Sequence, residues 1–273
     1  MVYSFCSRQN CTDGSSPAAG LIDVGGRLYG TTSAGGAHGL GSVFSIDRNT
    51  GKEKVLYSFA GGMDGETPFA SLIDVNGVLY GTTASGGGDN VEGCNFGCGT
   101  VFSLDPETRV EQVVYSFAGD TDGAGPAAGL IDIGGILYGT TSSGGGGDCA
   151  NYFGCGTVFS VDPGTGTETV LHAFAGADGA IPAAGLIDVG GILYGTTYKG
   201  GRFGTGTAFS LDPTTGAESV VHSFCVAHGP CMGDGYSPLA GLIDVHGTFY
   251  GTTEYGGGTN AFGTVFSLKE KRR

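Results

Sequence analysis

Eight cysteines form four closely spaced pairs, and cysteines paired in this way either join as disulfides or bind a metal ion. The pairs are Cys6–Cys11, Cys94–Cys98, Cys149–Cys155 and Cys225–Cys231. Their even number, their spacing and their equivalent placement favour four local disulfides and an oxidising compartment. The segment CNFGC suggests a zinc site, but each pair lacks a second pair or a regularly placed histidine nearby. We therefore predict four disulfides, with metal binding as the weaker alternative.

Repeated aspartates are the second set of residues that could do chemistry. Five of them begin a D-G-x-x-P loop: Asp13, Asp64, Asp122, Asp178 and Asp234. An Asp-Gly step followed by proline is typical of a turn in which the carboxylate accepts local backbone N–H groups. Calcium binding is the alternative, and Asp120 and Asp122 of the segment GDTDG are its best candidates.

Five further aspartates lie in a repeated L-I-D-V or L-I-D-I segment. They are Asp23, Asp74, Asp132, Asp188 and Asp244. A ring of such carboxylates could hold a cation. Hydrogen bonds to threonine or backbone groups of the next repeat are the simpler interpretation, because buried polar groups are normally paired.

Catalytic signatures are absent from the sequence. It contains no G-x-S-x-G, H-E-x-x-H or phosphate-binding P-loop motif. A glycoside hydrolase needs two or three unlike carboxylates around one site, so its acids should break the repeat. The acids that break it lie in loops without an evident partner: Glu66, Asp89, Glu92, Asp120, Asp148 and Glu254. His172 and His222 stand where other repeats carry tyrosine, which indicates a structural role. We therefore predict a protein that is not an enzyme and holds no cofactor.

Composition excludes several classes of protein. The net charge of −14 argues against nucleic-acid binding, which needs a surface rich in lysine and arginine. Hydrophobic residues make up 40% and charged residues 14%, which argues against disorder in spite of 57 glycines. No apolar run approaches the ~20 residues of a membrane-spanning helix. The start of the chain, MVYSF, shows no signal peptide.

A repeat that runs along the whole chain must position these residues. A Y-G-T-T motif begins at Tyr29, Tyr80, Tyr138, Tyr194 and Tyr250, at spacings of 51, 58, 56 and 56 residues. Each repeat contains four short runs rich in β-branched and aromatic residues, bounded by turn signals. In the third repeat these runs are residues 128–133, 136–141, 156–162 and 168–174. Four antiparallel strands in a repeat of this length predict one blade of a β-propeller.

The two ends of the chain predict how the ring closes. Residues 2–5 (VYSF) match a fourth strand, whereas residues 263–268 (GTVFSL) are a third strand with no fourth strand after them. We expect these two segments to pair, which would complete the fifth blade and remove an open edge. The predicted fold is all-β: a single five-bladed β-propeller domain over residues 1–273. Its blades are expected at about 18–60, 68–118, 126–175, 182–225 and 238–269, the last completed by residues 1–6.

Aromatic residues at three repeated positions are the expected packing layers. The Y-G-T-T tyrosines form one layer. The second is the phenylalanine of V/A-F-S: Phe44, Phe102, Phe159, Phe209 and Phe266. The third is the phenylalanine that ends the fourth strand: Phe5, Phe59, Phe117, Phe174 and Phe224. The glycines are expected where turns are tight or backbones approach closely.

The repeat also resembles a known family. The segment YSFAGDTDGAGPAAGLIDIGGILYGTTSSGGG, followed by GCGTVFSVDPGTG, is similar to the glycine-rich GloVer repeat of choice-of-anchor surface proteins. The resemblance covers essentially the whole chain. It implies a secreted or surface-attached, propeller-like repeat protein with no settled activity. The paired cysteines depart from the family pattern, and so does the lack of an anchor before the final KEKRR.

Strand direction predicts which face binds a ligand. Because the strands alternate in direction, the long loops after the second and fourth strands emerge on one face, and the tight turns emerge on the other. The long loops carry all the cysteines and most of the variation between repeats. The candidate ligand-binding residues there are His38, Phe96, Asn151, Tyr152, Phe153, Tyr198, Lys199, Arg202, Phe203, Glu254, Tyr255, Asn260 and Phe262. Aromatic rings beside polar groups could stack on sugars. For the phenylalanines, however, we favour the interpretation that each ring covers its own loop.

These observations favour a secreted or cell-surface binding module. Near-identical blades would give near-identical sites, which suits multivalent recognition of a repetitive ligand such as a glycan. The alternative is a structural module of an extracellular matrix, sheath or filament that self-associates; a glycoside hydrolase-like enzyme is the weakest candidate. The expected partners are glycans or a surface protein, with no nucleic acid. Asn10-Cys11-Thr12 is an N-glycosylation sequon, usable in a glycosylating secretory pathway.

Overall fold

The computed structural model describes residues 1–88, 94–147, 149, 153–225, 234–258 and 262–269. The chain divides into two compact units, each of which is described by itself. The first unit comprises Met1–Gly119, Ala124–Leu137 and Val161–Glu168, and the second comprises Asp120–Gly123, Tyr138–Ser160 and Thr169–Arg273. Within the described residues, no helix is long and apolar enough to cross a membrane.

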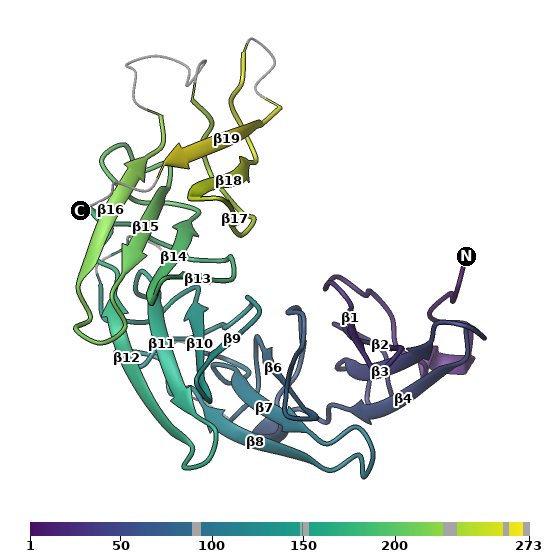
Figure 1. Ribbon diagram of the computed structural model, residues 1–273. Coiled ribbons are helices and arrows are strands. Elements are labelled where there is room, and N and C mark those ends of the chain that lie inside the picture. Colours follow the sequence, from purple (N-terminus) through teal and green to yellow (C-terminus); the bar gives the residue numbers. More distant parts are fainter. Residues whose placement is uncertain (89–93, 148, 150–152, 226–233, 259–261, 270–273) are drawn as a thin grey trace. The chain divides into compact units, whose positions relative to one another are not determined.

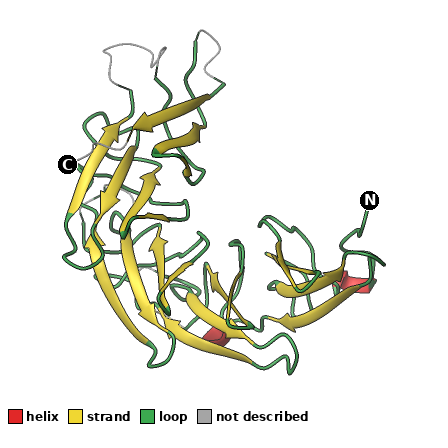
Figure 2. Ribbon diagram, viewed as in Figure 1, coloured by secondary structure: helices red, strands yellow, loops and turns green. Residues whose placement is uncertain are grey.

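The regular secondary structure of the described residues consists of antiparallel strands and two short 3₁₀ turns, joined by loops (Figures 1 and 2). The first sheet has the order β1 (Ile22–Val24), β2 (Arg27–Thr32), β3 (Ser42–Asp47) and β4 (Glu53–Ser58). The second has β5 (Ile73–Val75), β6 (Val78–Thr83), β7 (Thr100–Leu104) and β8 (Glu111–Ser116). The third has β9 (Ile131–Ile133), β10 (Ile136–Thr141), β11 (Thr157–Asp162) and β12 (Thr167–Ala173). The prediction of an all-β chain with four strands in each repeat is confirmed for these sheets.

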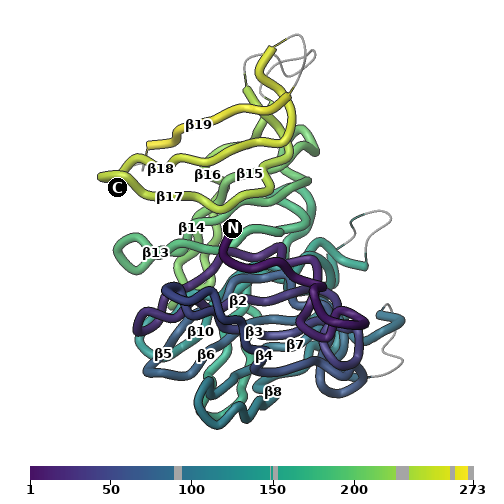
Figure 3. Tube along the Cα trace, turned by 90° about the vertical axis from the view of Figure 1, so that its right-hand side faces the viewer, coloured from purple at the N-terminus to yellow at the C-terminus, as the bar shows by residue number. Residues whose placement is uncertain are grey.

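The fourth and fifth sheets repeat the same order. The fourth consists of β13 (Ile187–Val189), β14 (Ile192–Thr197), β15 (Thr207–Leu211) and β16 (Glu218–Ser223). The fifth consists of β17 (Ile243–Val245), β18 (Thr248–Thr253) and β19 (Thr264–Lys269), which lie side by side in Figure 3. Among the described residues, two short 3₁₀ turns occur: η1 (Gln9–Cys11) precedes β1, and η2 (Gly62–Asp64) lies between β4 and β5. Each first strand has only three residues, shorter than the six-residue run expected from the sequence.

Phenylalanines form the contacts between neighbouring sheets. Phe59, at the end of β4, and Phe102 of β7 are both fully buried, and their ring centroids lie 5.1 Å apart in an edge-to-face pair. Phe174 and Phe209 repeat this 5.1 Å contact in the second unit. Burial of one such side chain stabilises the fold by about 2–3 kcal/mol. Two of the three expected aromatic layers are therefore core, whereas most of the Y-G-T-T tyrosines are only half-buried.

The Y-G-T-T motif is explained by close packing and by a link between sheets. A Cβ atom at Gly81 would lie 2.7 Å from the Phe102 ring, so only glycine fits beneath that ring. The first threonine of the motif reaches the neighbouring sheet: the hydroxyl of Thr82 donates to the carbonyl oxygen of Ala128 at 3.3 Å. The second bonds within its own sheet, as Thr83 does with Thr100 at 2.7 Å.

The closing strand is the part of the prediction that the structure does not show. Within the described residues the fifth sheet has three strands, and residues 2–5 are not in a strand. A strand needs a ladder partner, and none of the described residues pairs with this segment in a ladder. Its side chains nevertheless make fourth-strand contacts, because Phe5 packs edge-to-face on Phe44 with a centroid distance of 4.7 Å. Ring closure thus stays a prediction.

Candidate functional site

The two kinds of long loop meet at one end of each sheet. Isolated β-bridges join the D-G-x-x-P loop to the loop after the second strand. They pair Ser15 with Ala34, Glu66 with Ser85, Ala180 with Lys199, and Tyr236 with Tyr255. The candidate binding residues therefore lie on loops held by backbone hydrogen bonds.

Exposed phenylalanines project from the loop that precedes the third strand. Phe96, Phe153 and Phe262 are 73%, 71% and 89% exposed. Backbone hydrogen bonds hold two of these residues in place: the N–H of Gly86 donates to the carbonyl oxygen of Phe96 at 2.6 Å, and the N–H of Gly144 donates to that of Phe153. The expectation that each ring covers its own loop is therefore wrong for these three residues. At Phe96 and Phe153 the backbone carbonyl group bonds inwards, and all three rings are exposed.

His38 and Phe203 are the residues aligned with Phe96 and Phe153, whereas Phe262 lies two residues nearer to the third strand. His38 belongs to the first repeat and is exposed. Phe203 belongs to the fourth repeat and is half-buried, with the guanidinium carbon of Arg202 5.5 Å from its ring centroid. The predicted residues Asn151, Tyr152 and Asn260 lie outside the described residues.

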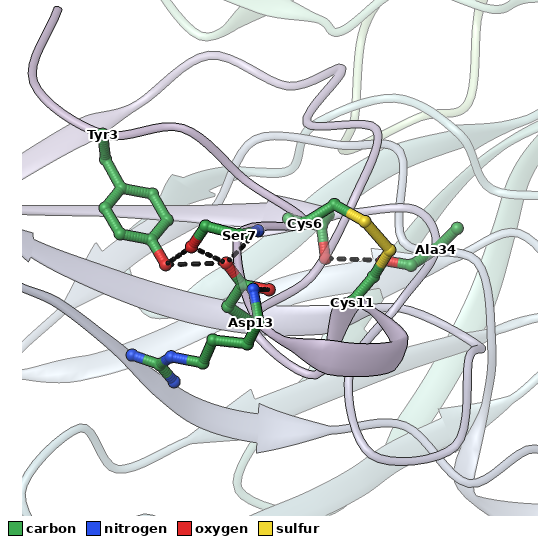
Figure 4. Close-up of a disulfide and its surroundings, with 8 residues drawn as sticks. Tyr3, Cys6, Ser7, Cys11, Asp13 and Ala34 are labelled. Atoms are coloured by element: carbon green, nitrogen blue, oxygen red, sulfur yellow. Dashed lines mark hydrogen bonds between the residues drawn. A yellow bond between two sulfur atoms is a disulfide. The ribbon is translucent and has the colours of Figure 1, made fainter.

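Disulfides hold several of these loops, and three of the four predicted pairs are confirmed. Cys94–Cys98 encloses Phe96, and Cys149–Cys155 encloses Phe153. Cys6–Cys11 lies in the first loop of the chain (Figure 4). The fourth pair cannot be assigned in the same way, because Cys231 lies outside the described residues. Closing a loop this short restricts the unfolded loop by roughly 2 kcal/mol, so these bonds fix loop conformation more than they hold the fold.

A tyrosine cluster on the second unit breaks the repeat. Two residues follow each Y-G-T-T motif: they are Ser, Ala or both in the first three repeats, but Tyr198-Lys199 and Glu254-Tyr255 in the last two. Tyr236 stacks on Tyr255, with centroids 5.2 Å apart, and the Lys199 ammonium lies 4.5 Å from the ring centroid of Tyr198. Glu254 bonds with the Tyr255 hydroxyl and raises its pKa. Tyr236 was not among the predicted residues.

The D-G-x-x-P aspartates act as turn residues. Asp13 is fully buried and accepts from the Tyr3 hydroxyl and from the N–H and hydroxyl of Ser7, at 2.7–2.9 Å (Figure 4). Burial opposes ionisation, but these hydrogen bonds outweigh it and lower the pKa of Asp13. Asp64 accepts from the Tyr57 hydroxyl and the Ala60 N–H in the same manner. This geometry matches the turn interpretation.

The remaining predicted carboxylates have simpler surroundings. The L-I-D-V aspartates are exposed, and each accepts the N–H of the second turn residue of its own hairpin, as Asp23 does from Gly26 at 2.9 Å. Their partner is therefore their own turn, not the next repeat as we had expected. Asp120 and Asp122 are not part of any described group of three or more potential metal ligands.

Glutamates at the start of the fourth strand are a repeated feature that the sequence reasoning missed. They are Glu53, Glu111, Glu168 and Glu218. In Glu53, Glu111 and Glu218 one side-chain oxygen is buried without a hydrogen-bond partner among the described residues. Burial raises the pKa of Glu111 to about 8, and the nearby charge of Asp64 adds to the effect. Glu53 differs because Arg8 pairs with it at 2.9 Å. The signal was in the sequence: each glutamate lies four residues before a fourth-strand tyrosine or histidine.

One of these glutamates belongs to a group that could bind a metal ion. His172, Asp178 and Glu218 each offer one ligand atom, and these atoms lie within 4.8 Å of one another. A separate groove of about 520 Å³ in the first unit lies at the tight-turn end of the sheets and is lined by Tyr80 and Asp105, among others. None of the predicted site residues lines this groove.

Comparison with known proteins identifies the repeat and the fold. A family model described as the Gloeobacter/Verrucomicrobia repeat matches residues 2–153 and 149–273. Comparison with curated proteins finds no match.

Solved structures share the propeller-like arrangement at low sequence identity. The extracellular domain of a candidate hybrid two component system from B. thetaiotaomicron is 11% identical, with a TM-score of 0.60 over 95% of this chain and 27% of that one. A candidate 6-phosphogluconolactonase from Bacteroides uniformis is 16% identical, with a TM-score of 0.54 over 90% and 64%. A chain of a nidogen/laminin complex is 14% identical, with a TM-score of 0.52 over 84% and 68%. At these identities the similarity shows the fold alone.

Proposed function

The chain belongs to the Gloeobacter/Verrucomicrobia repeat family, and we propose that it is a non-catalytic binding module of the cell surface or extracellular space. Its ligand is a repetitive glycan, and it binds through the long-loop end of the sheets. The observation that carries this proposal is the exposure of Phe96, Phe153 and Phe262 in the loops that precede the third strands, with the carbonyl groups of Phe96 and Phe153 bonded to the backbone.

The geometry of the phenylalanine loops supports binding. Large aromatic rings more than 70% exposed in the same kind of loop in three repeats support a contact surface. The backbone bonds at Phe96 and Phe153 lower the entropy cost of binding, because they restrict where these two rings can lie. The two enclosing disulfides keep Phe96 and Phe153 in this state and suit an oxidising, extracytoplasmic location.

The chemistry of the loops supports a glycan rather than a charged ligand. Sugar rings present flat C–H faces that pack on aromatic rings, while their hydroxyl groups bond with backbone and amide groups. The acidic composition disfavours polyanions. Equivalent rings on successive repeats would contact successive sugars, so weak single contacts would add up by avidity.

Ring closure belongs to the same proposal. A five-bladed propeller closed by residues 2–5 would place one phenylalanine loop, or its equivalent, in every blade of a single face. The fourth-strand contacts that Phe5 makes with Phe44 support this arrangement.

A glycan-array screen of the non-reduced protein tests the proposal. We expect saturable binding of an oligosaccharide, with a further loss of affinity as Phe96, Phe153 and Phe262 are replaced by alanine one after another. Phe69→Ala is the matched control, because Phe69 is 43% exposed but lies outside these loops. Absence of binding to every glycan, or an equal effect of the control, would overturn the proposal.

Self-association is the second candidate function, and one observation favours it. The fifth sheet exposes apolar side chains: Ile243 is 61% and Val265 is 77% exposed, whereas Val101, the equivalent of Val265 in the second sheet, is fully buried. Such a face could pair with another copy in a sheath or filament. Light scattering across a concentration series separates the two cases, since a binding module stays monomeric while a structural module forms larger assemblies.

A further inference from the structure

An unusual junction between two sheets lies in the second unit. The Nε2 atom of His172, on β12, lies 2.9 Å from Oδ2 of Asp178, and Oδ1 of Asp178 is fixed by the Ala175 N–H at 2.8 Å. Glu218, at the start of β16 in the next sheet, brings a third ligand atom within 4.8 Å of the other two. Its Oε1 atom is buried and has no hydrogen-bond partner among the described residues.

The equivalent junctions of the first unit also place a glutamate close to an aspartate, and there other side chains accommodate the two acids. In one of them Arg8 neutralises Glu53 at 2.9 Å. In the other, Tyr57 stands in the place of His172, and its hydroxyl donates to Asp64 at 2.7 Å. A tyrosine hydroxyl is a donor, whereas a neutral imidazole nitrogen is a metal ligand. The junction at His172 therefore differs from both: it has an imidazole and, among the described residues, no cation that pairs with Glu218.

We propose that His172, Asp178 and Glu218 form a binding site for a divalent transition-metal ion such as Zn²⁺, which joins β12 to β16. Two ligands of a tetrahedral zinc ion, each about 2.0 Å from it, lie about 3.3 Å apart. The 2.9 Å separation of Nε2 and Oδ2 is close to this value. The Glu218 ligand atom, within 4.8 Å of both, would move closer by side-chain rotation to become the third ligand. Water would complete the coordination.

The donor set selects the kind of ion. One imidazole and two carboxylates suit Zn²⁺ and its neighbours in the first transition row, whereas Ca²⁺ takes six to eight oxygen ligands. The side chains of His172 and Asp178 are 19% and 23% exposed, so an ion can reach them from solvent. Because the ligands come from two sheets, the bound ion would act as a structural cross-link in the second unit.

The protein itself provides a matched control. His222 and Asp234 form the same pair, with Nε2 and Oδ2 3.0 Å apart, but no described glutamate completes their group. Both histidines can be changed to tyrosine, the residue that stands at this position in three other repeats: Tyr3, Tyr57 and Tyr115. The repeat itself shows that this substitution is compatible with folding.

The test is a titration of the metal-free, disulfide-intact protein with Co²⁺, followed by its visible absorption and by displacement with Zn²⁺. We expect one equivalent to bind, and His172→Tyr or Glu218→Gln to weaken binding at least about tenfold. His222→Tyr should leave binding unchanged, and Ca²⁺ should not compete. Circular dichroism verifies that each variant is folded. If His172→Tyr does not fold, the test rests on Glu218→Gln, because glutamine has nearly the same shape as glutamate. Lack of Co²⁺ binding, or equal weakening by His222→Tyr, would overturn the proposal.

Discussion

Replacing Glu111 with glutamine should make the protein more resistant to alkaline pH. Glu111 starts β8 and has one oxygen buried without a described partner, and its neighbour Asp64 is held by the Tyr57 hydroxyl. Burial and, secondarily, the charge of Asp64 raise the pKa of Glu111 to about 8 from an ordinary value of 4.5. The folded state therefore favours the protonated acid.

The sign of the effect follows from which state ionises first. Below about pH 4.5 the carboxyl of Glu111 is neutral in both states, so the stabilisation that comes from its raised pKa is fully present. As the pH rises towards 8 the unfolded chain ionises first, and this stabilisation is lost. Glutamine is neutral at every pH, so the free energy of unfolding of the variant increases relative to that of the wild type as the pH rises.

The size of this stability difference is set by the pKa shift of Glu111 and by solvent screening. A rise from 4.5 to about 8 corresponds to roughly 5 kcal/mol at 1.36 kcal/mol per pKa unit. Glu111 is only partly buried, so solvent screening reduces this figure, and about 2 kcal/mol is a realistic expectation. The free energy of unfolding of Glu111→Gln should therefore exceed that of the wild type by about 2 kcal/mol more at pH 9 than at pH 5.

Guanidinium unfolding at the two pH values provides the measurement. The chain has 12 tyrosines and no tryptophan, so tyrosine fluorescence and circular dichroism are the suitable signals. The control is Glu107→Gln, because Glu107 is exposed in the turn before β8. A difference between variant and wild type that is the same at pH 5 and pH 9 would refute the reasoning, as would an equal response of the control.

Three further predictions follow from the packing and the loops. Gly81→Ala should destabilise the fold by about 1–3 kcal/mol in thermal unfolding, because its Cβ would lie 2.7 Å from the Phe102 ring. Opening Cys94–Cys98 by a double change to serine should weaken glycan binding in titration calorimetry while the circular dichroism spectrum stays the same. Deletion of residues 1–5 should accelerate hydrogen exchange at the outer edge of β19; unchanged exchange there would argue against ring closure.

The strand order could be predicted from the sequence because the repeat displays each strand several times. A single copy of L-Y-G-T-T could belong to many structures, but five copies between turn signals define a blade. The length of the first strand in each repeat was overestimated for a physical reason. In the third repeat, β9 comprises only Ile131–Ile133, and the apolar residues before it pack on the core without joining a strand ladder. Apolar character predicts burial but not hydrogen bonding.

The candidate site was predicted less well because exposure depends on the backbone. The sequence places Phe96 between two glycines and two cysteines, and either orientation of the ring is compatible with that setting. The bond from the Gly86 N–H to the Phe96 carbonyl decides the matter, since it turns the backbone inwards and the ring outwards. Tyr236 was missed for a similar reason: its stacking on Tyr255 is a contact between two loops that lie far apart in the sequence.

The junctions between sheets show how a repeated aspartate–glutamate pair can have different properties in different repeats. In the junctions at Glu53, Glu111 and Glu218, an aspartate that accepts hydrogen bonds lies close to a wholly or partly buried glutamate of the next sheet, and such a pair is unfavourable unless something neutralises it. In the first unit, Arg8 supplies a cation to Glu53, and Glu111 is instead driven towards its protonated form. Next to Glu218 the corresponding residue is His172, which can bind a metal ion together with Asp178 and Glu218. The identity of one neighbouring side chain thus decides whether the same backbone geometry yields an ion pair, a titrating group or a metal site.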